Sequence, residues 1–264
     1  MQFRIILKVE QPGQLLPLSY QYELSAWLYK LMGSSQSGFS EFLHSNGYVV
    51  GKKRFKLFTF SNLFVPQYEI IDDRMKVNCP EVSFIVSFLV EQAATELVLG
   101  LFNSQRLKLG DRISQLTLRV QETSFLPIVN ITGNCVKLRT TSPLLVSAPR
   151  LKENGKLTHD YLDPQDERYP EFFFKNLLDK YQAARTHNLV GQIDYNANMQ
   201  IKVLTDRPRR RGIKIKAFTP EETKIIAYDF DFEITAPPEL IQLGIIAGFG
   251  GENALGFGAT KLMN

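Results

Sequence analysis

The sequence predicts an α+β protein built from two tandem β-α-β-β-α-β units. Strand-like and helix-like hydrophobic periods alternate along the chain, and the same order of elements occurs in both halves. The length of 264 residues permits one large domain or two ordinary ones. With 44% hydrophobic and 22% charged residues, the composition is that of a folded protein and excludes a disordered one.

The first unit is assigned to residues 1–124. Its first strand is predicted from the apolar alternation between Phe3 and Val9, and its first helix from a stripe of apolar residues between Tyr20 and Leu31. The remaining predicted elements are a short helix around 39–43, a strand over 54–61, a hairpin turning at 72–73, a strand over 82–89, a helix over 91–102 and a strand over 116–120.

The second unit is assigned to residues 125–264 and repeats this order. Its predicted elements are a strand over 129–138, a helix over 171–184, strands over 199–204 and 212–218 joined by a basic turn, a long strand over 224–235, a helix over 237–246 that begins with proline and a strand over 259–263. Two such units form a tandem ferredoxin-like (RRM-like) arrangement. That fold hosts many functions, so it does not by itself give this one.

Composition also limits the class of protein. The net charge of +4 permits a nucleic-acid partner only if the positive charge is concentrated somewhere. Two cysteines, Cys79 and Cys135, argue against a disulfide framework and a cysteine-based zinc site, and suit a reducing compartment. The N-terminus does not have the pattern of a signal peptide, and no apolar run approaches the ~18 residues of a membrane span. We therefore expect a cytoplasmic protein without a membrane partner.

Positive charge is concentrated around the basic turn. Six cations lie there, on a chain whose total excess is four: Arg207, Arg209, Arg210, Arg211, Lys214 and Lys216. Such a cluster is expected to hold phosphates and steer RNA, with affinity falling as salt rises. These contacts position a backbone and do not read its sequence. The alternative is an ordinary solvated hairpin tip.

The alternation of Asp229, Asp231 and Glu233 places three carboxylates on one face of a strand. We interpret them as a polar outer face, because no His or Cys accompanies them, and we predict no metal site and no cofactor. His159 and His187 lie in polar segments and are expected to be solvated.

A glycine-rich loop precedes the last strand. Six of the 17 glycines lie in it: Gly244, Gly248, Gly250, Gly251, Gly256 and Gly258. The loop is neither a Walker loop nor a dinucleotide-binding fingerprint, because it follows a helix and leads into a strand. Glycines permit positive φ and close backbone approach, so free N–H groups can cradle a phosphate. The alternative is tight packing of the last strand against the other domain.

The wording of this loop, IIAGFGGENALGFGATKL from Ile245, closely resembles the C-terminal signature of the RAMP superfamily of CRISPR-associated proteins. Within that superfamily it is most similar to the endoribonucleases that process CRISPR precursor RNA. In the N-terminal half, WLYK, EFLHSNG and FKLFTFS resemble the tyrosine, histidine and lysine segments of the same family.

The helical period places Tyr29 opposite the apolar stripe of its helix, and His44 opposite the apolar side of the short helix. Both side chains are thus predicted to point away from the core. Histidine titrates near neutral pH, which suits general acid–base work, although a lone histidine is more often an ordinary solvated side chain. The resemblance assigns His44 as the general acid–base, Tyr29 as the helix tyrosine and Lys56 as the cation beside the phosphate. Lys52 and Lys53 are rivals for the last role.

The resemblance implies a metal-independent endoribonuclease that cleaves CRISPR repeat RNA by 2′-hydroxyl attack. It implies RNA contacts from the basic cluster and from the loop glycines 248, 250, 251, 256 and 258. The implied partners are CRISPR repeat RNA and other CRISPR-associated proteins of an interference complex, with the chain a monomer or homodimer. Two other interpretations stay open: a module that binds repeat RNA without cutting it, and a structural subunit that lines guide RNA.

Overall fold

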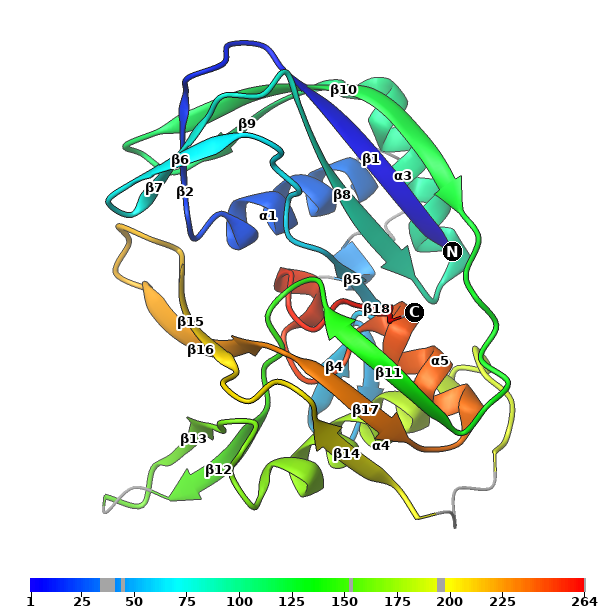
Figure 1. The fold of residues 1–264 in the computed structure, drawn as a ribbon. Helices are drawn as coiled ribbons and strands as arrows, with labels where there is room; N and C mark the ends of the chain where they lie inside the picture. The colour runs from blue at the N-terminus through cyan, green and yellow to red at the C-terminus, as the bar shows by residue number, and fades with distance from the viewer. Residues whose placement is uncertain (34–40, 44–45, 152–153, 194–197, 264) are drawn as a thin grey trace.

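The computed structural model describes residues 1–33, 41–43, 46–151, 154–193 and 198–263. Its two halves each hold an antiparallel sheet with two helices, and Figure 1 shows the helices of each half gathered on one face of its sheet. This confirms the predicted pair of tandem ferredoxin-like units.

The first sheet has the strand order β5-β8-β1-β10-β9. Its central strand, β1 (Gln2–Val9), pairs antiparallel with both neighbours, and the two helices are α1 (Gln21–Met32) and α3 (Glu91–Asn103). The predicted apolar stripe of α1 is buried, which explains why this helix forms where the sequence places it. The remaining strands of this sheet are β5 (Phe58–Phe60), β8 (Glu81–Phe88), β9 (Arg106–Gly110) and β10 (Gln115–Leu126).

Three further pieces are inserted in the first half. They are a small sheet of β2 (Leu15–Pro17), β6 (Tyr68–Ile71) and β7 (Arg74–Val77), the hairpin of β3 (Tyr48–Val50) and β4 (Lys53–Phe55), and the strand β9 before β10. The predicted strand over 54–61 is therefore wrong as one element. Leu57 takes a left-handed φ of 55° between β4 and β5, and no strand continues through that conformation.

The second sheet has the order β14-β17-β11-β18, again antiparallel throughout. Its strands are β11 (Cys135–Thr140), β14 (Gln200–Val203), β17 (Asp231–Thr235) and β18 (Thr260–Leu262), and its helices are α4 (Tyr169–Thr186) and α5 (Pro238–Ala247). Two hairpins project from it: β12 (Ser147–Leu151) with β13 (Leu157–Tyr161), and β15 (Arg209–Ile215) with β16 (Thr223–Asp229).

Two predictions in this half are corrected. The long strand over 224–235 is interrupted at Phe230, a residue that is 4% exposed and whose N–H donates to Thr140 Oγ1 at 3.0 Å. β16 and β17 consequently join different sheets. The strands predicted to flank the basic turn do not pair with each other, because β14 pairs with β17 and β15 pairs with β16.

β10 runs to Leu126, so the first sheet extends slightly past the predicted boundary at 124. None of the helices in the described part of the chain is long and apolar enough to cross a membrane. The two halves are held together by the glycine-rich loop, drawn in red in Figure 1, which packs against α1 and β5 through the short 3-10 helix η1 (Asn253–Leu255).

Candidate active site

A cavity of about 840 Å³ lies where the two halves meet. One wall comes from α1 and from residues 53–57 of the first half. The other comes from the β12–β13 hairpin, α4 and the glycine-rich loop of the second half. The sequence elements singled out at opposite ends of the chain therefore converge on one concave site.

Tyr29 lines this cavity from α1, but it does not point away from the core as predicted. It is half-buried, and its ring lies edge-on to the buried Phe58, with centroids 5.7 Å apart. The helical period misplaces it because β5 packs beside this side of α1. Burial, and secondarily the charge of Glu252, raise the pKa of Tyr29. Its phenol therefore stays protonated near neutral pH and can donate a hydrogen bond.

Lys56 lines the same cavity from the link between β4 and β5. The residue is half-buried, and burial, with the nearby Arg54 charge, lowers the pKa of Lys56. Of its two rivals, Lys53 also lines the cavity, but its ammonium pairs with Asp179 at 2.5 Å. Lys52 is exposed.

His44, the predicted general acid–base, lies outside the described residues. The chain that follows it is described and sits against Lys56. Gly47 adopts a φ of 59°, and a Cβ added there would lie 3.3 Å from Lys56 Nζ and 2.7 Å from the Phe55 carbonyl oxygen. The segment after His44 is thereby fixed next to one wall of the cavity.

The loop glycines serve close packing. A Cβ on Gly250 would lie 2.1 Å from the Leu145 carbonyl oxygen, one on Gly258 1.9 Å from that of Phe249, and one on Gly256 2.6 Å from the Phe60 ring. The last of these contacts joins the two halves, as the packing alternative predicts. Any side chain at these positions would force the loop out of place.

The phosphate cradle predicted for this loop has few donors to offer. The N–H groups of Gly251, Gly256 and Gly258 donate to the carbonyl oxygens of Leu145, Asn253 and Pro143 at 2.8, 3.0 and 2.9 Å. Among the five glycines assigned to RNA binding, Gly250 and Gly251 line the cavity. The amides of Gly251, Gly256 and Gly258 are therefore not free to cradle a phosphate.

Two side chains that the sequence reasoning missed lock the loop. Lys180 of α4 is 2% exposed, and its ammonium donates to the carbonyl oxygens of Gly248 and Gly250, to the latter at 2.7 Å. Burial, and then the charge of Lys53, lower the pKa of Lys180 well below its usual value. Asn253 Nδ2 donates to the carbonyl oxygens of Phe249 and Phe257 at 2.9 and 3.0 Å. A lysine in a helical pattern gives no sign of such a role.

Two hydrogen bonds from the first half also hold the glycine-rich loop in place. Ser25 Oγ of α1 donates to the Ala254 carbonyl oxygen at 2.6 Å, and Thr59 Oγ1 of β5 donates to that of Phe257 at 3.0 Å. The element that carries Tyr29 is therefore bonded directly to the loop. These two hydrogen bonds fix the position of the loop relative to α1 and β5, the two elements that line or flank the other side of the cavity.

Comparison with family models identifies the chain. The model described as "CRISPR associated protein Cas6, C-terminal" matches residues 124–262, and "CRISPR-associated protein Cas6, N-terminal" matches residues 15–121. The chain belongs to the Cas6 family. The two matched regions meet close to the predicted boundary between the units.

Relatives agree with this assignment to the Cas6 family. The chain is 25% identical to a "Putative CRISPR-associated endoribonuclease-like protein Cas6" from Pyrococcus furiosus, over 100% of this chain and 99% of the relative. It is also 25% identical to the "CRISPR-associated endoribonuclease Cas6" of the same organism, over 94% of this chain and 83% of that protein. A solved structure titled "An RAMP protein binding different RNA substrates" shares the fold, with a TM-score of 0.81, 21% identity and full coverage of both chains.

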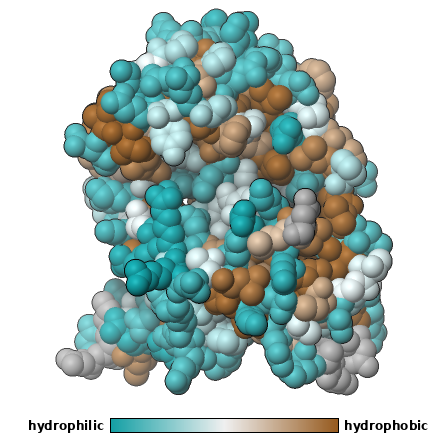
Figure 2. Space-filling view, viewed as in Figure 1, coloured by the Kyte–Doolittle hydropathy of each residue, from teal (hydrophilic) through white to brown (hydrophobic). Residues whose placement is uncertain are grey.

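The basic cluster of this Cas6-family chain lies along β15 and not at a hairpin tip. On the face shown in Figure 2, hydrophilic residues gather over β15 and β16, at the waist between the halves. Three of the six cations face carboxylates: Arg211 lies 3.4 Å from Asp229, Lys214 lies 3.7 Å from Glu222, and Lys216 pairs with Glu221. Arg210 bonds Tyr228, while Arg207 and Arg209 are exposed. The positive charge is therefore partly neutralised, which the sequence cluster alone does not reveal.

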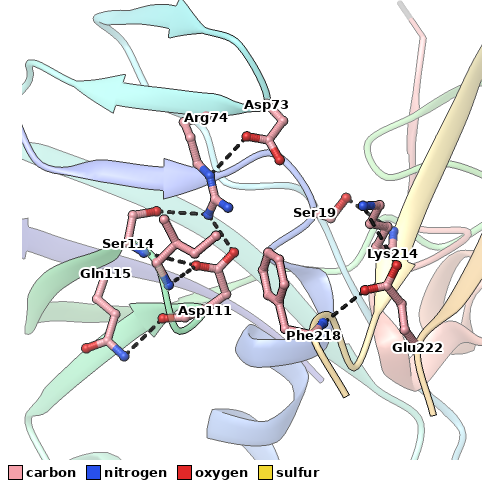
Figure 3. Close-up of polar contacts among 10 residues, drawn as sticks. Ser19, Asp73, Arg74, Asp111, Ser114, Gln115, Lys214, Phe218 and Glu222 are labelled. Carbon is pink, nitrogen blue, oxygen red and sulfur yellow. Dashed lines mark hydrogen bonds and ion pairs between the residues drawn. The ribbon is translucent and has the colours of Figure 1, made fainter. Parts of the chain in front are cut away.

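The hairpin is seated on the first half (Figure 3). The Lys214 N–H donates to Ser19 Oγ at 3.2 Å, and the Phe218 N–H donates to Glu222 at 2.9 Å. Phe218 lies beside the turn of Asp111, whose carboxylate pairs with Arg74 at 2.5 Å. Hydrogen bonds from the Ser114 and Ile113 N–H groups and from Arg74 outweigh burial and lower the pKa of Asp111. The basic strand thus bridges the two halves.

The three carboxylates predicted to share one strand face are divided, because Asp229 ends β16 and faces Arg211, whereas Asp231 and Glu233 lie on β17 in the other sheet. Asp231 accepts two hydrogen bonds from Arg139 at 2.8 and 2.7 Å, and Glu233 is half-buried beside it on β17. Within the described ranges, no group of three or more His, Cys, Asp or Glu side chains is arranged to hold a metal ion. His187 is exposed and its ring lies edge-on to Tyr48 at 5.1 Å, whereas His159, also exposed, lines the cavity.

Proposed function

We propose that this chain is a metal-independent endoribonuclease that cleaves CRISPR repeat precursor RNA. The attacking group is the 2′-hydroxyl of the substrate, and the products are guide RNAs with 2′,3′-cyclic phosphate and 5′-hydroxyl ends. The observation that carries the proposal is the convergence of Tyr29 and Lys56 on one cavity beside the glycine-rich loop, in a chain of the Cas6 family.

The chemistry assigns one role to each side chain. The 2′-oxygen attacks phosphorus, the bond from phosphorus to the 5′-oxygen breaks, and the proton lost by the 2′-hydroxyl is matched by one gained by the leaving oxygen. His44 serves as acid–base, Lys56 stabilises the charged phosphorane and Tyr29, whose raised pKa keeps it protonated, orients a hydroxyl or phosphate oxygen. None of these steps needs a metal ion.

RNA is held by the basic β15 strand and the loop glycines that reach the cavity. Arg207 and Arg209 are the strongest candidates for phosphate contacts because both are exposed, although Arg209 also lies opposite Asp229 in the strand pair, where its charge acts on that carboxyl. The partners that follow are CRISPR repeat RNA and other CRISPR-associated proteins of an interference complex.

The test is cleavage of repeat RNA in excess EDTA. We expect the wild-type protein to cut under these conditions, and His44→Ala to lose most of its activity, on the order of 10²-fold or more. RNA carrying a 2′-deoxy group at the cut should stay intact. Loss of cutting in EDTA would refute the metal-free reaction, unchanged cutting by His44→Ala would remove its role, and cutting of the deoxy substrate would exclude the internal nucleophile.

A second candidate is a protein that grips repeat RNA without cutting it. Its motivation is that a relative matched over the full chain is named as an endoribonuclease-like protein. The presence of a histidine at position 44 favours cutting. Tight binding of repeat RNA by wild-type protein with no product in the same assay would establish this second candidate instead.

A further inference from the structure

One face of α4 turns toward the cavity and carries an aromatic ring, an ammonium and an amide. Phe172, Lys175 and Asn176 all line the cavity, and they are three and four residues apart within the helix. Helical residues at these spacings are neighbours on one face, with Cβ atoms about 5–6 Å apart. The three side chains therefore form one surface, which we call the α4 face.

The ring of Phe172 offers a stacking surface to a ligand in the cavity. The residue is half-buried, and the ammonium of the exposed Lys175 lies over its ring, 5.9 Å from the ring centre. A ring face that a solvated side chain reaches is not covered by the core. The flexible lysine can give way to a planar group and bring its charge to a phosphate beside that group. Bases of single-stranded RNA bind in this way, stacked on aromatic side chains.

The side-chain amide of Asn176 is incompletely bonded. Its Oδ1 is buried and has no hydrogen-bond partner among the described residues, although Asn176 as a whole is half-buried and lines the cavity. A buried acceptor without a donor destabilises a protein, and such acceptors are rare. The terminal torsion of asparagine is soft, so the amide can turn this oxygen toward the cavity. A ligand that brings an N–H group to the α4 face would satisfy it.

We infer that the α4 face binds one adenine base of the RNA, which stacks on Phe172 and is read by Asn176. This inference rests on the proposed function, because the base belongs to RNA that enters the cavity. The amide presents an acceptor, Oδ1, beside a donor group, Nδ2. Adenine presents the matching pair, its N6 amine beside a ring nitrogen, and asparagine binds that pair with two hydrogen bonds.

Adenine suits this amide better than the other bases do. It places the amine next to a ring nitrogen acceptor on its Watson–Crick edge and again on its Hoogsteen edge. Guanine has only acceptors on the Hoogsteen edge, and the pyrimidines have no ring nitrogen there. Adenine is also a purine, and its two fused rings cover more of the Phe172 ring than a pyrimidine covers. Either edge of adenine therefore supplies the donor that Asn176 Oδ1 lacks.

The α4 face is fixed close to the other walls of the cavity. Lys53 of β4 pairs with Asp179, one turn beyond Asn176, at 2.5 Å. One residue further along α4, the Lys180 ammonium bonds the carbonyl oxygens of the glycine-rich loop. The cavity of about 840 Å³ is within the range of about 300–1,000 Å³ typical of ligand sites, so it has room for a base and its phosphate. The adenine is therefore assigned to a nucleotide near the linkage that is cut.

The experiment measures the Kd of four fluorescein-labelled RNA hexamers by anisotropy. The hexamers consist of adenosine, cytidine, uridine or purine riboside alone, and purine riboside is adenosine without its N6 amine. We expect wild-type protein to bind the adenosine hexamer about 10-fold more tightly than each of the other three, because they do not offer the same pair of hydrogen bonds.

Variants of the α4 face locate this preference. Asn176→Ala and Asn176→Leu should bind the adenosine and purine-riboside hexamers equally, and Leu keeps the size of the side chain without its polar atoms. Phe172→Leu should weaken binding of all four hexamers by about 5-fold or more while the adenosine preference stays, because stacking does not depend on base identity. Gln182→Ala is the control, since Gln182 is an exposed amide on α4 outside the cavity, and it should match wild type. Melting temperatures check the fold of each variant. Removal of an unpaired buried acceptor should not lower the value for Asn176→Leu.

The outcomes separate this inference from the proposed reaction. Equal binding of the four hexamers by wild type would overturn the adenine site, as would an adenosine preference that survives in both Asn176 variants. A preference for cytidine that these variants abolish would overturn adenine as the ligand. None of these results changes whether the wild-type protein cuts repeat RNA in EDTA. An adenosine preference that both Asn176 variants abolish, in a protein that does not cut, would refute the proposed reaction and retain the adenine site.

Discussion

The glycine-rich loop and the β15–β16 hairpin both stand out in the sequence, but they are built in opposite ways. The loop is largely buried, and its backbone groups bond within the protein, to Lys180, Asn253 and Leu145 among others. The hairpin buries one side, including Ile213 and Ile225, and its cations on the other side lie beside carboxylates that water screens. The loop therefore fixes the geometry of the cavity wall, whereas the hairpin supplies positive charge whose effect depends on the salt concentration. The two should therefore respond differently to mutation.

The largest effect is expected at Gly258. Its φ of 73° and the Phe249 carbonyl oxygen, 1.9 Å from any added Cβ, leave no room for a side chain. Gly258→Ala should lower the free energy of unfolding by about 4 kcal/mol. Urea denaturation measures this, with Gly191→Ala as the matched control, since a Cβ there meets nothing within 4 Å. Equal stability of the two variants would show that the loop is not rigid.

A somewhat smaller loss of stability is expected at the ion pair of Arg74 and Asp111, beside which the hairpin lies. The Arg74 and Asp111 side chains are 9% and 6% exposed, so Asp111→Asn removes the buried carboxylate from Arg74 and leaves it only the exposed Asp73 as an ionic partner, which should cost about 3 kcal/mol. Because the pKa of Asp111 is lowered in the folded state, its contribution is present above the unfolded value of 3.8 and is lost as pH falls through the folded pKa. The gap between wild type and variant, measured by urea denaturation, should narrow below pH 3.8. A gap that stays constant would contradict the ion pair.

Lys180→Met tests how strongly the buried lysine of α4 stabilises the glycine-rich loop. Removing the ammonium leaves the Gly248 and Gly250 carbonyl oxygens buried without their donor, which should cost about 2 kcal/mol at neutral pH. The folded protein lowers the pKa of Lys180, so the unfolded chain binds more protons as pH approaches 10.5. The advantage of wild type over the variant should thus grow as pH rises through this window, up to the unfolded pKa. Thermal unfolding at several pH values checks it, with Lys175→Met as the exposed control on the same helix.

The smallest effect on stability is expected at the exposed cations of the hairpin region. Arg207→Ala with Arg209→Ala should change the free energy of unfolding by less than about 0.5 kcal/mol. RNA affinity should fall, and the slope of log K against log salt should decrease by about 1 for each phosphate contact removed. Binding titrations at several salt concentrations test this. An unchanged slope would remove both residues from the RNA path.

Much of the fold was predictable because hydrophobic periods report which faces are buried. The stripe of α1 and the alternation of β1 are both buried as the sequence indicates. Breaks inside strands were not predictable in the same way. Leu57 and Phe230 look like ordinary strand residues, and only their three-dimensional neighbours turn the chain there.

The same distinction between local patterns and three-dimensional neighbours applies to the residues of the candidate site. Tyr29, Lys56 and the glycine loop were predictable because their wording resembles a family, and all three line the cavity. Lys180 and Asn253 were missed, since a lysine in a helix or an asparagine in a loop carries no periodic or motif signal. Their roles depend on residues more than 60 positions away or on the local backbone that the packing imposes.

The sequence by itself determined the main helices, the two-unit architecture and the family, because periodicity and wording are local properties of the chain. The tertiary structure decided which of the cations are neutralised and which glycine N–H groups are already bonded. Those properties depend on distances between segments far apart in the chain, and a linear pattern does not contain them.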